Sequence, residues 1–126
     1  MSISVRISAA TPEADLEAVV QPGVSTVLYP RCESPLQVER ADRQIAQLER
    51  LRGIRPGSVT IGVMIESPGG VCVISEIAAS SPRISSLGTG PHLDLAGDAL
   101  AYAQAECELV ARAFELPPLN LSNLGD

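Results

Sequence analysis

The sequence predicts an α/β fold in which helices cover a parallel sheet. Runs rich in β-branched residues alternate four times with segments of helical character, which is typical of strand–helix units. No linker or low-complexity segment divides the 126 residues, so we expect one domain over residues 1–126. Crossovers between parallel strands are right-handed. The strand–helix pairs are predicted, in order, over residues 3–9 and 11–20, 24–30 and 34–53, 58–66 and 70–80, and 83–90 and 97–115.

Helix boundaries are marked by capping residues and breakers. The first helix has Thr11 as N-cap and Pro12 at the first helical position. The second opens with Ser34 as cap and has Gln37 three residues later, which together predict a capping box. Gly53 then closes that helix.

Composition narrows the classes of function. The formal net charge is -6, which argues against a nucleic-acid or anionic-membrane surface. Only one Phe, two Tyr and no Trp are present, so stacking on bases is not expected.

The N-terminal stretch has no positively charged segment and no long apolar run, so neither secretion nor a membrane span is signalled and we expect a cytoplasmic protein. Three cysteines without metal-ligand spacing fit a reducing compartment.

Polar residues gather where the predicted strands end. Glu66 ends an otherwise apolar run and precedes Ser-Pro-Gly-Gly; a carboxylate there must reach water or meet a cation, because burying it unpaired costs several kcal/mol. The carboxyl ends of parallel strands form one edge of the sheet, where ligands bind in barrels and open sheets. These residues predict a ligand site, or they are solvated loop charges. They are Arg6, Ser8, Arg31, Glu33, Glu66 and the stretch 90–94.

Other residues that could take part in catalysis or binding are given simpler roles. His92 is the only histidine, and it is interpreted as a surface residue. Cys32 follows Arg31, whose charge could lower the pKa of the thiol, but the sequence positions no general base, so nucleophilic catalysis is not expected. The glycines of "SPGG" and "GTGP" are interpreted as turn residues.

Four stretches, in this order, resemble the HpcH/HpaI aldolase and citrate lyase beta-subunit family. They are "VRISAATPEADLEAVV", "VLYPRCESPLQVERAD", "IGVMIESPGGVCVISEIAASSPRISSLGTG" and "LAYAQAECELVARAFELPPLN". The resemblance implies parallel (β/α) units of a TIM barrel. It covers only the middle of that barrel, which takes about 250 residues when closed. We therefore expect an incomplete barrel, about half of one, that forms a homo-oligomer or binds a partner chain completing the barrel.

The resemblance also implies roles for individual residues. Arg6 matches an arginine that contacts the substrate's carboxylate or thioester carbonyl and is the expected catalytic residue, because its charge would assist the enolate that forms as the bond breaks. Ser8 stands beside it in the predicted substrate site. Glu66 matches a glutamate that binds Mg²⁺, and Asp94 is the second metal ligand. By the same resemblance, the substrate is a small carboxylate or an acyl-CoA.

The sequence departs from the family pattern at several positions. "GPHLDL" delays Asp94 by one residue after Gly90, so the loop must bulge for the carboxylate to reach the metal. Further substitutions are Ser8 for Asn, Arg31 for Lys, Gln104 for Arg and Asn120 for Asp. Two hypotheses therefore stand. One is a magnesium-dependent carbon–carbon lyase acting on a hydroxy acid or its coenzyme A thioester. The other is a non-catalytic binding or assembly subunit, or a truncated relic of such a lyase.

Overall fold

The computed structural model describes residues 2–117 and 119. Within them the chain forms four strands and five helices. The strands are β1 (Ser4–Arg6), β2 (Thr26–Tyr29), β3 (Thr60–Ile65) and β4 (Ile84–Thr89). The helices are α1 (Pro12–Val19), α2 (Pro35–Leu51), α3 (Pro68–Cys72), α4 (Ile74–Ala78) and α5 (Gly97–Ala113). No helix in the described part of the chain is long and apolar enough to cross a membrane.

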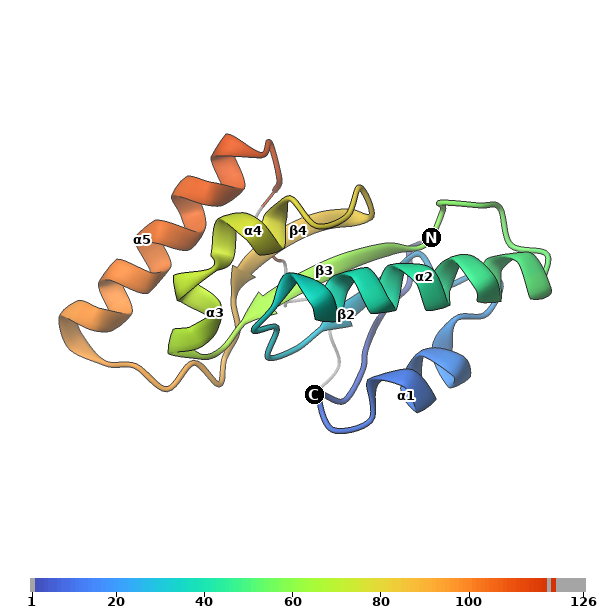
Figure 1. Ribbon diagram of the computed structural model, residues 1–126, viewed down its shortest axis with the longest axis horizontal. Helices are drawn as coiled ribbons and strands as arrows, with labels where there is room; N and C mark the ends of the chain where they lie inside the picture. The colour runs from blue at the N-terminus through green and yellow to red at the C-terminus, as the bar shows by residue number, and fades with distance from the viewer. Residues whose placement is uncertain (1, 118, 120–126) are drawn as a thin grey trace.

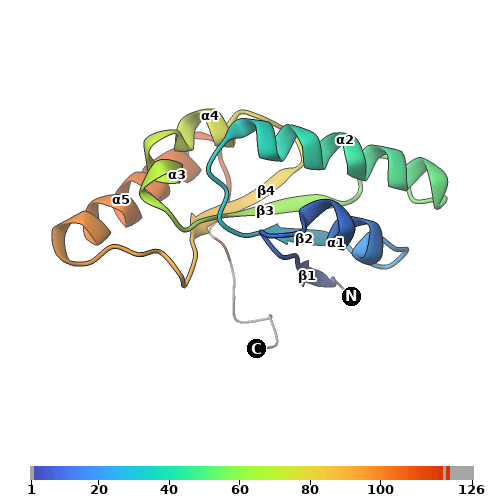
Figure 2. The same cartoon turned by 60° about the horizontal axis from the view of Figure 1, so that its bottom comes forward.

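The strands form one open parallel sheet in the order β1-β2-β3-β4. When consecutive parallel strands are neighbours and every crossover is right-handed, the connecting helices fall on the same face. Figures 1 and 2 show this arrangement, with the helices stacked on one side of the sheet. This is the architecture of TIM-barrel units that have not closed into a barrel, as predicted.

The strand register separates the two faces of the sheet. Val27, Ile61 and Ile84 lie side by side in one row and belong to the buried core beneath the helices. The neighbouring row faces the other way, on what we call the inner face, because side chains alternate along a strand. The inner-face row consists of Arg6, Leu28, Gly62 and Ser86.

Helix α2 begins where the sequence predicts. The Ser34 hydroxyl accepts a hydrogen bond from the Leu36 N–H, and the Gln37 side chain accepts from the Ser34 N–H, so the predicted capping box is present. The single helix predicted over 70–80 is wrong. The chain forms two five-residue helices instead, α3 and α4, and Val73 between them leaves helical geometry at φ -123° and ψ 25°.

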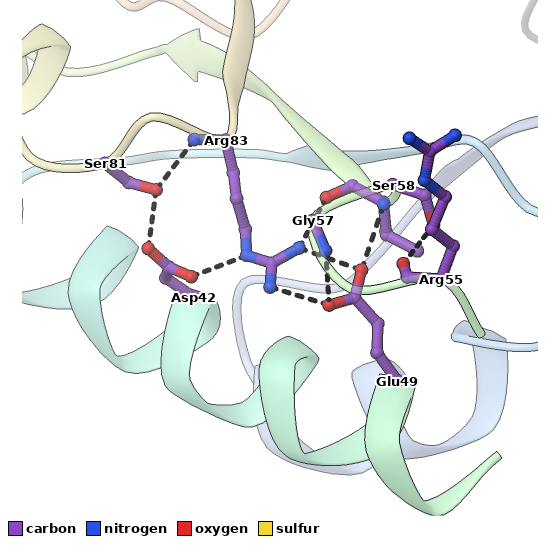
Figure 3. A network of polar contacts seen from close by, with 8 residues as sticks. Asp42, Glu49, Arg55, Gly57, Ser58, Ser81 and Arg83 are labelled. Carbon is purple, nitrogen blue, oxygen red and sulfur yellow. Dashed lines mark hydrogen bonds and ion pairs between the residues drawn. The ribbon is translucent and has the colours of Figure 1, made fainter. Parts of the chain in front are cut away.

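A buried ion network joins α2 to the amino-terminal ends of β3 and β4 (Figure 3). The Arg83 guanidinium donates to Glu49 Oε1 at 2.7 Å and Oε2 at 3.0 Å and also contacts Asp42. Glu49 in turn accepts from the Gly57 and Val59 N–H groups. Because this network lies at the opposite end of the strands from the predicted site, it fixes the sheet without occupying the ligand edge.

Candidate functional site

Glu66 lies at the carboxyl end of β3, and its carboxylate is buried, with 1% of the residue exposed. Its Oε1 accepts a hydrogen bond from the Arg31 N–H at 3.0 Å, and its Oε2 accepts from the His92 N–H at 3.0 Å. The two donors belong to the loops that follow β2 and β4. Glu66 therefore holds together the edge of the sheet formed by the segments after the strand ends, which we call the rim.

The backbone around Glu66 is shaped to admit its side chain. A Cβ atom at position 90 would lie 2.5 Å from Cγ and Cδ of Glu66, so only glycine leaves room there. Arg31 has φ 51°, in the left-handed region that non-glycine residues rarely adopt. Strain of this kind concentrates at ligand sites, where the surrounding structure maintains it. Here it accompanies an N–H directed at the Glu66 carboxylate.

A second contact links the β2 loop to the start of α3. The Ser67 hydroxyl donates to Glu33 Oε2 at 2.9 Å and accepts from the Gly70 N–H at 3.1 Å. A Cβ at Gly70 would lie 2.5 Å from the carbonyl oxygen of Cys32, so these backbones pack closely. The Arg31 to Glu33 stretch and the Glu66 end of β3 thus meet, as the sequence predicts.

Arg6 and Ser8 lie apart from this cluster. Arg6 is exposed on the inner face, in the row of Gly62, four residues before Glu66 along the strand direction. At ~3.3 Å per residue this offset is about 13 Å, so only an extended side chain or a ligand could connect the two groups. No hydrogen bond or ion pair joins the Arg6 side chain to another residue in the described ranges.

Asp15 organises the loop that carries Ser8, and the sequence analysis missed it. Its Oδ2 accepts from the Ser8 N–H at 2.7 Å, and its Oδ1 accepts from the Thr11 hydroxyl at 3.1 Å. The Ser8 hydroxyl accepts from the Ala10 N–H. An Asp four residues after an N-cap Thr, in the first turn of the helix that follows the strand end, is the signal that could have indicated it.

Asp94 is exposed in the loop between β4 and α5, two residues after the His92 N–H that binds Glu66. A turn closed by the Leu93 N–H and the Gly90 carbonyl precedes it. Among residues 2–117 and 119, no three His, Cys, Asp or Glu side chains form a group that could hold a metal. Any cation would therefore need water or substrate oxygens beside Glu66 and Asp94.

The sequence analysis also named Cys32, His92, Gln104 and Asn120. Burial raises the pKa of the Cys32 thiol to about 11, so the idea that Arg31 lowers this pKa is wrong. The His92 side chain is exposed, and its backbone N–H is the group that the rim uses. Gln104 is exposed on α5. Asn120 lies outside the described residues.

The fold and the rim define a class: an open parallel sheet of TIM-barrel units with a buried carboxylate at the carboxyl ends of its strands. The family model described as HpcH/HpaI aldolase/citrate lyase matches residues 1–115. The chain belongs to this family.

Individual relatives agree with this assignment. The citrate lyase subunit beta of Escherichia coli strain K12 is 35% identical over 89 residues, which cover 68% of this chain and 30% of the relative. The citrate lyase subunit beta of Haemophilus influenzae is 36% identical over 76 residues, covering 60% of this chain and 26% of the relative. The chain thus spans about a third of the length of the curated relatives that it matches.

Solved structures show the same fold at low identity. A citrate lyase crystal structure from Burkholderia xenovorans superposes with a TM-score of 0.74 at 15% identity, covering 93% of this chain and 42% of that one. The Haloferax volcanii malate synthase in its pyruvate/acetyl-CoA ternary complex gives 0.72 at 15% identity, covering 93% and 38%.

Proposed function

We propose that the chain carries the cation- and substrate-binding rim of a magnesium-dependent carbon–carbon lyase that acts on a hydroxy acid or its coenzyme A thioester. The observation that supports this proposal is the Glu66 carboxylate, which is fixed at the rim by N–H groups from two loops. Family membership supplies the reaction class. We also propose a cytoplasmic location, because three free thiols suit a reducing compartment.

The residues present fit Mg²⁺ in their chemistry. A carboxylate has about four lone-pair sites, and the two N–H groups bound to Glu66 use two of them. Glu66 and Asp94 would hold the cation through hard oxygen donors, with water or substrate completing the shell. When bound, Mg²⁺ supplies positive charge for the negative charge that develops on a substrate oxygen as the carbon–carbon bond breaks.

Arg6 and Ser8 have separate tasks in this proposal. The Arg6 guanidinium would bind the substrate carboxylate or thioester carbonyl, since it presents a planar pair of donors that stays charged. Ser8 would add a hydroxyl on the same strand end. The exposed inner-face position of Arg6 supports this role, because its side chain is accessible to a ligand that also reaches the rim.

A second candidate function is a non-catalytic binding or assembly subunit. The 1% exposure of Glu66 favours it, because a carboxylate with both oxygens bonded to backbone can serve structure alone.

Titration calorimetry with Mg²⁺ and Mn²⁺ separates the two functions. We expect the wild type to bind, and Glu66→Gln and Asp94→Asn each to abolish binding. Asp98→Asn is the matched control, because it removes the same charge four residues later, in the first turn of α5, and should bind normally. If only Glu66→Gln abolished metal binding, Asp94 would not be a metal ligand. Absence of binding in the wild type would leave the non-catalytic subunit as the better account.

Substrate binding is tested with a small 2-keto acid in the presence of Mg²⁺. Arg6→Ala should weaken binding by about 1.5 to 3 kcal/mol, the range for a hydrogen bond to a charged group. Arg43→Ala, an exposed arginine of α2, is the control and should leave the affinity unchanged. If Arg6→Ala bound the 2-keto acid with unchanged affinity, Arg6 would have a structural role and not a substrate-binding one.

A further inference from the structure

A small polar cleft lies between α1 and α2, on the helix-covered side of the sheet. The two helices lie side by side there (Figure 1), and the Gln44 amide of α2 donates to the Glu13 carbonyl of α1 at 2.7 Å. The cleft has a volume of about 130 Å³, which is room for roughly four water molecules at ~30 Å³ each. Its polar lining comes from Glu13, Tyr29, Gln37, Arg40 and Gln44.

Tyr29 forms the floor of this cleft. It ends β2, and its side chain belongs to the core beneath the helices, with 4% of the residue exposed. In the described part of the chain, every fully buried side-chain nitrogen or oxygen has a hydrogen-bond partner. The Tyr29 hydroxyl bonds to none of the described residues, so it must have an open side, and the cleft is the space that it faces. A ring held in the core thus offers its polar end to whatever fills the cleft.

Most of the groups around this hydroxyl are hydrogen-bond donors. The Arg40 guanidinium makes no ion pair within the described ranges. The Gln37 carbonyl oxygen accepts from two backbone N–H groups just before α2, which leaves its NH₂ group as the part that can donate to a ligand. Gln44 uses one N–H on the Glu13 carbonyl and has a second. A ligand with acceptor oxygens suits this lining.

Glu13 limits the charge that the cleft can accept. Burial raises the pKa of the Tyr29 hydroxyl, Cys32 and Glu13 add to this effect, and Arg40 opposes it. The charges of Glu13 and Arg40 therefore both act at the hydroxyl. Arg40 can bind one carboxylate through two parallel N–H bonds, whereas each further negative charge would meet repulsion from Glu13. The lining favours a ligand with a single negative charge.

We propose that this cleft is a binding site for a small monocarboxylate, held by the Arg40 guanidinium and the Tyr29 hydroxyl with the Gln37 amide beside them. The site is separate from the rim, because Tyr29 points toward the helices whereas Arg6 lies on the inner face of the sheet. It goes beyond the proposed lyase function and does not rest on it. Acetate is small enough for the volume of the cleft and serves as the probe.

The two tyrosines of the sequence make the binding observable. They are Tyr29 and Tyr102, and Tyr102 is 64% exposed on α5. When sodium acetate is titrated into the chain at constant ionic strength, the ring NMR signals of Tyr29 should shift to saturation and those of Tyr102 should stay. No saturable shift at Tyr29, or the same shift with sodium chloride alone, would overturn the site.

Inorganic phosphate tests the preference for a monoanion. Near pH 8 phosphate is mostly a dianion, so its second charge meets Glu13, and it should need about a tenfold higher concentration than acetate to saturate the Tyr29 shift. Glu13→Gln removes that repulsion and should tighten acetate binding about two- to fivefold. Phosphate binding as tightly as acetate, or acetate binding weakened by Glu13→Gln, would contradict a monocarboxylate site.

Substitutions identify the groups that hold the ligand, with binding followed through the side-chain amide NMR signal of Gln44. Arg40→Gln should raise the dissociation constant of acetate about tenfold or more, and Tyr29→Phe about two- to tenfold, the ranges for hydrogen bonds to charged and to neutral groups. Arg43→Gln, on an exposed arginine outside the cleft, is the control and should bind normally. Equal affinities in Arg40→Gln and Arg43→Gln would overturn the proposal.

Two further measurements separate this site from the core and from the rim. Tyr29→Phe should leave the midpoint of urea unfolding unchanged, because the hydroxyl has no protein partner to lose among the described residues. A large drop would show that the hydroxyl serves the core and not a ligand. Arg6→Ala should leave the acetate response of Tyr29 intact, and loss of that response would assign acetate to the rim. Metal calorimetry reports on the rim alone, so either proposal can fail without the other.

Discussion

Glu66 and Gly90 depend on each other in packing. Because a Cβ at position 90 would lie 2.5 Å from Glu66 Cγ and Cδ, Gly90→Ala must displace that side chain. We expect the free energy of unfolding, measured in urea, to fall by about 1 to 3 kcal/mol, as for other overpacked sites. Metal binding should weaken in the same variant.

Gly69→Ala is the matched control for this change. A Cβ at Gly69 would meet nothing closer than 3.7 Å, an ordinary contact with Glu33. Its effect on stability should stay within about 0.5 kcal/mol. Equal losses in the two variants would contradict the close packing of Glu66 against Gly90.

Sequence alone could predict where Glu66 lies but not what binds it. An acidic residue after an apolar run, followed by Ser-Pro-Gly-Gly, indicates the strand end. The partners are backbone N–H groups of Arg31 and His92, 35 and 26 residues away. Backbone donors carry no residue-type signal, so they become visible only when the register of the sheet is known.

At the scale of elements, Arg83 attaches α2 to the sheet. Arg83→Met would leave the Glu49 carboxylate, 1% exposed, without its cation. Breaking a buried pair in this way costs about 3 to 5 kcal/mol. The double variant Arg83→Met/Glu49→Met removes both charges and should recover much of that loss in urea unfolding. A double variant as unstable as the single one would show that the unpaired Glu49 carboxylate does not cause the loss of stability.

The same pair predicts how stability depends on pH. Burial acts to raise the pKa of Glu49, but hydrogen bonds from Arg83, Gly57 and Val59 outweigh it, and the pKa lies below its ordinary 4.5. The unfolded chain therefore binds this proton more readily than the folded one. The contribution to stability is full above about pH 4.5 and is lost as the pH falls through the folded pKa. Urea unfolding from about pH 7 to 3 should show this loss, and Glu49→Gln should reduce it.

The sequence predicts the elements unevenly. The capping box of Ser34 and Gln37 locates α2 because the signal is local. The sequence analysis did not single out Glu49, which follows Ile45 by four residues on the buried face of that helix and whose partner, Arg83, is 34 residues away. The break at Val73 between α3 and α4 escaped prediction, because an apolar run is compatible with one buried helix.

At the scale of the whole molecule, Leu119, close to the C-terminus, packs on the inner face of the sheet against β3 and β4. Its side chain comes within 3.1 to 3.3 Å of where Cβ atoms would stand at Gly62 and Gly88. Leu119→Ala should therefore lower the free energy of unfolding by about 1 kcal/mol, since Leu119 is partly buried. Leu109→Ala, on a residue that is 64% exposed, is the control and should change it by less than about 0.5 kcal/mol. Equal effects in urea unfolding would contradict this packing.

The two N–H groups that bind Glu66 make the rim observable by hydrogen exchange. Arg31 and His92 are exposed residues in loops, where amide protons normally exchange within the fastest class. Because both protons are held by a buried carboxylate, they should exchange with deuterium only when the rim opens. Their protection factors, followed by NMR, thus measure the free energy of opening at the site in the absence of any ligand, and Gly90→Ala should lower both together.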